Sequence, residues 1–302
     1  MRRVSPLLLL ALFTTTVVAE SACAPVEDSS YTPSSKKRKT TNPNGDDTDD
    51  TEATDPTNPA GDDTTPMQPG TDAGSTMVQD NGTRGTGGPV GASTQTSSSG
   101  LSYMIDAPAP GTKPRGVLVL LHGSGASNYT KMVSMMSAVA QTYDLIRVSV
   151  LAPNGQGWNE GNQAQGVDKL HQLVQQDLFT KYNIDKTKVL FSGQSSGAGF
   201  LSSMFVPAHA KDYRGGAFLQ CGAGAPPASF APDASTKAGF KMHFEITTGD
   251  TIWPRQYGEA TTNYASLGMQ LTKDNTKTGG HCAFDQQAVI QAHIGFVLGA
   301  TR

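Results

Sequence analysis

The chain has 302 residues, enough for one large domain or two small ones, and a formal net charge of −3. No basic domain is present that would indicate a nucleic-acid partner. The one dense basic run, Lys36–Lys39, stands in a polar tract with a nearby proline, where a solvated patch is the usual interpretation.

The N-terminal residues have the pattern of an export signal. Two arginines precede the apolar stretch Pro6–Ala19, which is shorter than the roughly 20 residues that a membrane-spanning helix needs. Residues 1–22 are therefore predicted to be a signal peptide of the general secretory route. Cys23 follows small residues and resembles the lipidation site of bacterial lipoproteins, while plain cleavage after Ala19 is the alternative.

Residues 23–100 form a tract rich in Asp, Thr, Pro and Gly with almost no large apolar side chain. Such a segment buries too little surface to offset its ordering entropy, so it is predicted to be a disordered linker. Acidic, proline-bearing chains stay extended, which suits a tether between a membrane anchor and a folded domain. A cleaved pro-segment or a simple spacer is the alternative.

The folded domain is expected to span residues 101–302, enough for one sizeable core. The aliphatic run Gly116–Gly123 is typical of a strand buried on both faces of a parallel sheet. Further strands are predicted at 145–154, 188–193, 215–224 and 241–250, and helices at 129–143, 166–182, 197–208 and 286–299. This alternation predicts an α/β fold, a mostly parallel sheet with helices on both faces. Ligands in such folds bind beyond the carboxyl ends of the strands.

The segment Gly193–Gly197 matches the pattern G-x-S-x-G and lies between a predicted strand and a predicted helix. Both glycines are needed where the strand and the helix approach closely around a strained turn. Ser195 is therefore the predicted nucleophile, and Ser196 contributes its backbone N–H to an oxyanion. A flexible surface turn is the alternative interpretation.

A serine nucleophile needs a base, and the base needs an orienting carboxylate. Of the six histidines, His281 alone lies in a glycine-bearing loop between the last acid candidate and the terminal helix. Asp250 ends a predicted strand, although a solvated turn residue would look the same. The order Ser195, Asp250, His281 is that of α/β hydrolases.

The glycine-rich loop after the first buried strand, His122–Ser127, is a candidate for the electrophilic part of the site. The backbone N–H of Ser124 or Gly125 is expected to join that of Ser196 around a developing oxyanion. An ordinary strand-ending turn is the alternative.

Five segments resemble successive motifs of the secreted polyhydroxybutyrate-depolymerase and feruloyl-esterase group of α/β hydrolases: LVLLHGSG, GWNEG, KVLFSGQSSGAG, TTGDTIWP and GGHCAFD. The resemblance covers residues 101–302 and implies a carboxylic-ester hydrolase with the three catalytic residues above. It also implies that Trp158 and Asn159 lie beside the substrate mouth. The chain departs from the group before Asp250, where a His-Gly pair is common and Thr248-Gly249 stands.

Cys221 and Cys282 form an even pair in a domain expected to be exported, which favours a disulfide over two buried free thiols. No cofactor and no metal site are expected. The expected partner is an ester substrate, small or polymeric. The protein is expected to be a monomer, secreted or held at the cell surface or outer membrane through Cys23.

The sequence thus predicts an exported serine hydrolase that cleaves carboxylic esters, with polyesters and plant-polysaccharide acyl or feruloyl esters as candidate substrates. A serine peptidase or amidase on the same fold is one alternative, because triad chemistry does not separate esters from amides. A catalytically silent, surface-anchored binding protein is the other.

Overall fold

The computed structural model describes residues 81–159 and 163–299. The predicted signal peptide, the lipidation site Cys23 and most of the expected linker, residues 23–80, lie outside the described residues. No helix in the described ranges has both the length and the apolar character needed to cross a membrane.

Eight strands in the described part of the chain form one sheet, in the spatial order β1-β2-β4-β3-β5-β6-β7-β8. All neighbouring pairs from β4 to β8 are parallel, and only β1 and β2 run antiparallel to their neighbours. The strands are β1 (Gly91–Thr96), β2 (Ser102–Ala107), β3 (Arg115–Leu121), β4 (Leu145–Val150), β5 (Ile184–Gln194), β6 (Gly215–Gln220), β7 (Phe240–Glu245) and β8 (Leu271–Asp274).

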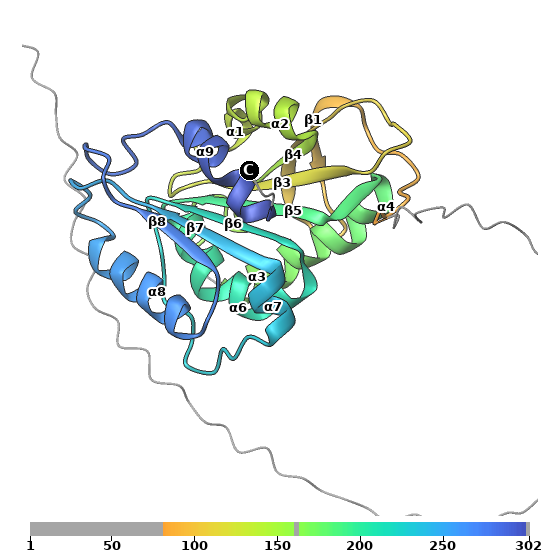
Figure 1. Cartoon of the computed structure of the whole chain (residues 1–302). Helices are drawn as coiled ribbons and strands as arrows, with labels where there is room; N and C mark the ends of the chain where they lie inside the picture. Colours follow the sequence, from red (N-terminus) through yellow and green to blue (C-terminus); the bar gives the residue numbers. More distant parts are fainter. Residues whose placement is uncertain (1–80, 160–162, 300–302) are drawn as a thin grey trace, which may run out of the picture. The chain divides into compact units, whose positions relative to one another are not determined.

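Helices cover both faces of the sheet, with α1, α2 and α9 on one face and α3, α6, α7 and α8 on the other (Figure 1). The α-helices are α1 (Tyr129–Met135), α2 (Ser137–Tyr143), α3 (Gln163–Gln172), α4 (Phe179–Lys181), α5 (Ser196–Phe200), α6 (Val206–His209), α7 (Ala234–Gly239), α8 (Pro254–Ser266) and α9 (Gln286–Leu298). The π-helical turns η1 (Leu173–Leu178) and η2 (Leu201–Phe205) and the 3₁₀ turn η3 (Ala210–Asp212) continue them. The predicted fold class is confirmed.

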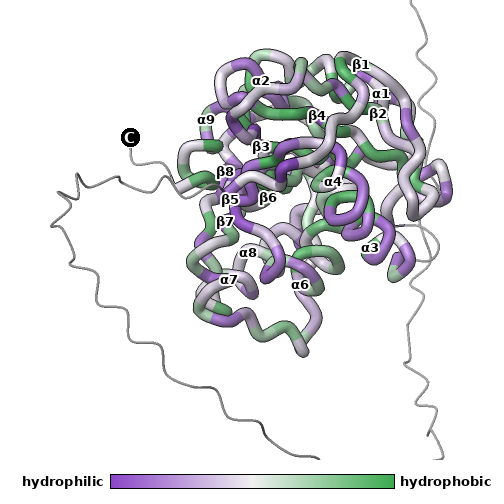
Figure 2. The backbone as a smooth tube through the Cα atoms, turned by 90° about the vertical axis from the view of Figure 1, so that its right-hand side faces the viewer, coloured by the Kyte–Doolittle hydropathy of each residue, from purple (hydrophilic) through white to green (hydrophobic). Residues whose placement is uncertain are grey.

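Two hydrophobic cores lie on opposite faces of the sheet, and β3 contributes to both. Val117 and Val119 pack into the core under α3 and α5, whereas Leu118 and Leu120 pack against α1, α2 and α9. Side chains of a strand point alternately to the two faces, so a strand buried on both sides needs an unbroken aliphatic run. Figure 2 shows hydrophobic segments at β3 and β4 and hydrophilic stretches around α3 and α4.

The linker boundary predicted at residue 100 is wrong, because the chain joins the fold earlier. Gly82 forms a bridge with Asp185, and β1 pairs with β2 along its whole length. Every second residue of β1 is exposed, so this edge strand carries no hydrophobic pattern. Its backbone hydrogen bonds to β2 order it instead.

Candidate active site

Ser195 lies at the sharp turn between β5 and α5, with φ 49° and ψ −113°. A Cβ atom added to Gly193 would stand 2.5 Å from the backbone N of Ala198, and one added to Gly197 would stand 2.6 Å from the carbonyl O of Leu121. Both flanking positions therefore admit only glycine. The positive φ of Ser195 holds its side chain at the carboxyl edge of the sheet.

One hydrogen-bond chain joins the three predicted catalytic residues. The Ser195 hydroxyl lies 2.9 Å from His281 Nε2, and His281 Nδ1 lies 2.7 Å from Asp250 Oδ2. The Asp250 side chain is fully buried, whereas Ser195 and His281 are half-buried. An imidazole that donates its Nδ1–H to the carboxylate presents the Nε2 lone pair to the serine hydroxyl, as a general base requires.

The second oxygen of Asp250 holds one wall of the site. Asp250 Oδ1 accepts hydrogen bonds from the backbone N–H groups of Ile252, at 2.8 Å, and Trp253, at 3.2 Å. The carboxylate therefore orients the imidazole with one oxygen and fixes a turn beside the serine with the other. Glu245, the last residue of β7, instead contacts Lys277 Nζ at 3.1 Å and His243 Nε2 at 3.3 Å.

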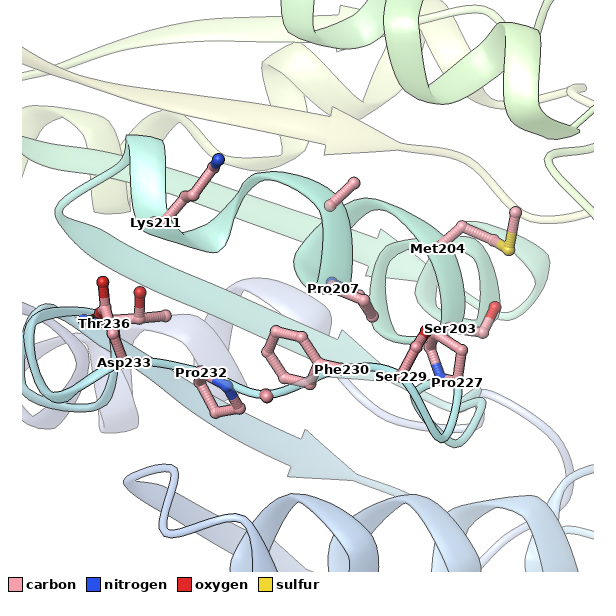
Figure 3. Close-up of a pocket in the computed structure, with 12 residues that line it drawn as sticks. Ser203, Met204, Pro207, Lys211, Pro227, Ser229, Phe230, Pro232, Asp233 and Thr236 are labelled. Atoms are coloured by element: carbon pink, nitrogen blue, oxygen red, sulfur yellow. Dashed lines mark hydrogen bonds between the residues drawn. The ribbon is translucent and has the colours of Figure 1, made fainter. Parts of the chain in front are cut away.

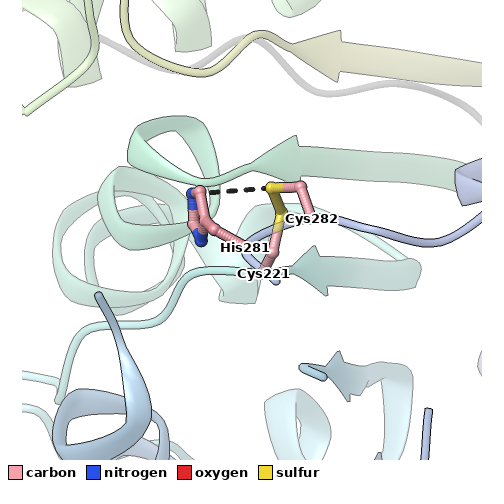
Figure 4. Close-up of side chains that lie close together, drawn as sticks. All are labelled: Cys221, His281 and Cys282. Carbon is pink, nitrogen blue, oxygen red and sulfur yellow. Dashed lines mark hydrogen bonds between the residues drawn. A yellow bond between two sulfur atoms is a disulfide. The ribbon is translucent and has the colours of Figure 1, made fainter. Parts of the chain in front are cut away.

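The loop that carries His281 is tied to the sheet in two ways. A disulfide joins Cys282 to Cys221, directly after β6, and Figure 4 shows it beside the imidazole. The Thr247 hydroxyl donates to the carbonyl of Gly280 at 2.9 Å. These restraints act on both sides of His281 and hold its ring beside Ser195.

Two of the three predicted oxyanion donors have an N–H group that is not used within the local structure. Ser196 is the first residue of α5, where an N–H has no acceptor within its helix, and the N–H of Ser124 has no acceptor among the described residues. Gly125 was also predicted as a donor, but its N–H donates to the carbonyl of Gln156 at 2.8 Å. The contribution expected of Gly125 is therefore corrected, because this hydrogen bond occupies its only donor.

His122 shapes the loop that carries Ser124. It is fully buried, its Nε2 accepts from the N–H of Ala152 at 3.0 Å, and its Nδ1 lies 2.5 Å from the carbonyl of Gly123. Burial lowers the pKa of His122, in keeping with a neutral ring that donates from Nδ1 and accepts at Nε2. The ring thus connects the glycine-rich loop to the segment after β4.

The serine opens into a cavity of about 450 Å³ with one polar and one apolar side. Asn128 Nδ2 donates to Gln194 Oε1 at 3.0 Å on the polar side. Trp253 and Ile252 form the apolar side, and Ile252 is 57% exposed. The lining consists of Gly123, Ser124, Ser127, Asn128, Gln194, Ser195, Ile252, Trp253, His281 and Cys282.

Trp158 was expected at the substrate mouth, and the structure contradicts this. Its side chain is only 2% exposed and packs on Phe200 with ring centroids 4.9 Å apart. Asn159 lies outside the cavity lining, and its amide nitrogen approaches Gly199 from the same side as the Trp253 ring. The tryptophan at the mouth is Trp253, which was not predicted from the sequence to lie there. Its spacing from Asp250 could have indicated this position, because aspartate side chains commonly accept hydrogen bonds from backbone N–H groups two and three residues later.

A second cavity, of about 500 Å³, contains none of the three residues of the hydrogen-bond chain. It lies between α6 and the loop before α7, where Figure 3 shows Phe230 across from Pro207. Cavity volume therefore does not identify the candidate active site. The hydrogen-bonded serine, histidine and aspartate identify it.

A scan against known protein families finds no match, and a search of curated proteins finds no relative. Solved structures do match the fold. A ferulic acid esterase aligns with a TM-score of 0.51 and 15% identity, over 70% of this chain and 97% of its own. An acetyl xylan esterase from Aspergillus awamori aligns with a TM-score of 0.52 and 16% identity, over 69% of this chain and 100% of its own. The chain has the α/β-hydrolase fold, and at this identity the likeness extends to the fold alone.

Proposed function

We propose that this chain hydrolyses carboxylic esters through a covalent intermediate on Ser195. The observation that carries the proposal is the continuous hydrogen-bond chain from Ser195 through His281 to the buried carboxylate of Asp250. A serine hydroxyl is a weak nucleophile, and this arrangement supplies the base that activates it and the charge that stabilises the protonated base.

The first step forms the acyl-enzyme. Ser195 Oγ attacks the ester carbonyl carbon while His281 Nε2 takes the hydroxyl proton, and Asp250 stabilises the resulting imidazolium. The carbonyl oxygen gains negative charge and accepts hydrogen bonds from the backbone N–H groups of Ser196 and Ser124. The tetrahedral intermediate then collapses, the C–O bond to the alcohol breaks, and His281 returns its proton to the leaving oxygen.

The second step releases the acid. Water takes the position of the departed alcohol, His281 Nε2 accepts one of its protons, and the water oxygen attacks the acyl carbon. Collapse of this second intermediate breaks the bond to Ser195 Oγ, which regains its proton from His281. The products are the carboxylic acid and the free serine, so no external cofactor enters the balance.

Labelling by a fluorophosphonate probe tests the proposal, because the probe forms a stable bond only with an activated serine. We expect label on Ser195, no label on Ser195→Ala, and turnover of p-nitrophenyl esters that falls by several orders of magnitude in that variant. Ser196→Ala is the matched control: it keeps the backbone N–H and should remain active. An unlabelled native chain, or equal losses in the two variants, would refute the assignment.

Esters rather than amides are proposed as substrates, and the solved structures of similar fold named above, both esterases, support this choice. Polyesters and acyl or feruloyl esters of plant polysaccharides remain the candidate classes. Parallel assays on p-nitrophenyl esters and on peptide p-nitroanilides separate the two bond types. We also propose export through residues 1–22 and a lipid anchor at Cys23, which mass spectrometry of the purified native protein tests.

A further inference from the structure

A second cluster of reactive side chains lies outside the active site. His171 lies in the last turn of α3, His209 ends α6 and Asp212 ends η3, and one ligand atom of each lies within 4.8 Å of the others. Both histidines are half-buried and Asp212 is exposed, so the cluster is open to ions from solvent. None of the three residues takes part in the proposed ester hydrolysis.

The hydrogen bonds of the two rings indicate which nitrogen of each can face an ion. His209 Nδ1 lies 3.0 Å from Asp212 Oδ2, and His171 Nδ1 lies 2.9 Å from the hydroxyl of the buried Tyr213. A His171 ring that donates from Nδ1 to this hydroxyl carries its lone pair on Nε2. His209 becomes a ligand in the other neutral tautomer, with its proton on Nε2 and the Nδ1 lone pair directed toward Asp212.

This donor set matches the preference of divalent transition metals. Imidazole nitrogen and carboxylate oxygen are ordinary ligands of Zn²⁺, and ligating histidines commonly hydrogen-bond through their other ring nitrogen to a carboxylate or another oxygen. His171 already has that arrangement with the hydroxyl of Tyr213, whereas His209 Nδ1 and Asp212 Oδ2, 3.0 Å apart, could both bind one ion that takes the place of the proton between them. We propose that His171, His209 and Asp212 form a surface binding site for Zn²⁺ or a similar transition-metal ion, with water completing the coordination.

Binding requires the two imidazoles to move. Their rings are stacked with centroids 3.9 Å apart and planes 11° from parallel. Each lone pair lies in the plane of its ring, so two parallel rings cannot direct His171 Nε2 and His209 Nδ1 at one ion. With bonds of about 2.0–2.1 Å in a tetrahedral site, the two nitrogens come to about 3.3 Å apart and the ring planes must open. Loss of the stack is therefore a signature of occupancy.

An ion bound there would connect two helices that support the nucleophile. α3 packs against the helix that begins at Ser196, since a Cβ atom on Gly166 would stand 3.4 Å from the ring of Phe200. His209 lies at the far end of that same helical run. A ligand that binds only the folded state lowers the unfolding equilibrium constant about 100-fold when its concentration is 100 times its Kd. The expected effect is a higher Tm.

No metal site was expected from the sequence, because the three residues form no short motif. His171 and His209 lie in separate helices, and Asp212 follows in a different turn. Only the packing of α3 against the run from α5 to η3 brings them together.

Isothermal titration of the full chain without a histidine tag, after dialysis against EDTA, tests the site with ZnCl₂ as the probe. We expect one Zn²⁺ per chain, a Tm increase with Zn²⁺, and affinity lowered at least about tenfold in His171→Gln, His209→Gln and Asp212→Asn. His293→Gln is the matched control, because His293 belongs to the other stacked pair, with His243, near Glu245. It should bind Zn²⁺ as the wild type does.

Three results would overturn the proposal: no binding at 1 mM Zn²⁺, binding retained in all three ligand variants, or binding lost in His293→Gln instead. Circular dichroism melts in EDTA show whether each variant is folded. If a histidine variant does not fold, Asp212→Asn, a substitution at an exposed position, still tests the site. Histidine proton shifts in NMR give a second readout. The Hε1 and Hδ2 signals of His171 and His209 should lose their mutual ring-current shift when Zn²⁺ binds, and unchanged shifts at saturating Zn²⁺ would contradict the proposal.

Discussion

The replacement Asp250→Asn separates the catalytic contribution of this side chain from its structural one. Oδ1 accepts the backbone N–H groups of Ile252 and Trp253, and Oδ2 faces His281 Nδ1. An asparagine keeps the two backbone hydrogen bonds only if its oxygen takes the Oδ1 position. Its amide nitrogen must then face His281 and donate to Nδ1, which puts the imidazole proton on Nε2. In that tautomer the ring cannot accept the proton of Ser195.

The expected loss is large in rate and small in stability. In the Ser-His-Asp template the wrong tautomer lowers kcat about 10⁴-fold, which is about 5.4 kcal/mol of transition-state stabilisation at 1.36 kcal/mol per tenfold. Because both backbone N–H groups keep an acceptor, Tm should stay within about 3 °C of the wild type, under about 1 kcal/mol for a domain of this size.

Initial rates on p-nitrophenyl acetate and circular dichroism melts measure the two quantities. Asp233→Asn is the matched control: Asp233 accepts the N–H of Thr236 at the start of α7, outside the site, and its substitution should leave kcat unchanged. A loss in Asp250→Asn below tenfold would refute the reasoning about the tautomer. A drop in Tm of 10 °C or more would show that Asp250 acts mainly through the turn.

Three further predictions concern the mouth, the disulfide and acid stability. Trp253→Ala should raise KM about tenfold with kcat nearly unchanged, because it removes the aromatic wall and keeps the backbone N–H that binds Asp250; an unchanged KM in steady-state assays would place substrate elsewhere. Removing the disulfide by Cys221→Ser with Cys282→Ser opens a loop of 61 residues and should lower the free energy of unfolding by about 4 kcal/mol in urea titrations, whereas a change under 1 kcal/mol would contradict this. Burial lowers the pKa of His122 in the folded state, so the unfolded chain binds more protons below about pH 6.5 and stability must fall as pH drops through that range. Urea titrations at pH 7.5 and 5.5 should show this loss, smaller in His122→Gln, and an equal loss in the variant would exclude His122 as its source.

The strands of the fold could be predicted where burial on both faces requires a continuous run of apolar residues. β3, β5, β6 and β7 are buried along much of their length and read as aliphatic or aromatic runs, so the parallel core was found from them. Edge elements carry no such pattern. β1 is half exposed and β8 is a four-residue strand with no fully buried side chain, and neither was predicted.

The three residues of the hydrogen-bond chain were predictable, because the proposed chemistry restricts their neighbours. Gly193 and Gly197 mark Ser195 since no other residue fits there, and His281 stands out by its loop. The mouth was harder to predict, because Trp158 is buried by a tertiary contact with Phe200, and only the spacing of Trp253 from Asp250 indicated which tryptophan lies there. The same limit applies to Gly125, whose donor is taken by a carbonyl from another loop.

The described chain enters the fold near the amino-terminal ends of the parallel strands, and the proposed active site lies beyond their carboxyl ends. Gly82 pairs beside the start of β5, and Ser195 follows the end of the same strand, roughly 30 Å away at about 3.3 Å per residue. Anything attached ahead of residue 81, whether a lipid, a fusion partner or a solid support, therefore joins the domain on the side away from the cavity. A solid support attached at residue 81 itself therefore leaves the mouth facing the bulk solution, and a bulky or insoluble substrate can approach without passing the point of attachment.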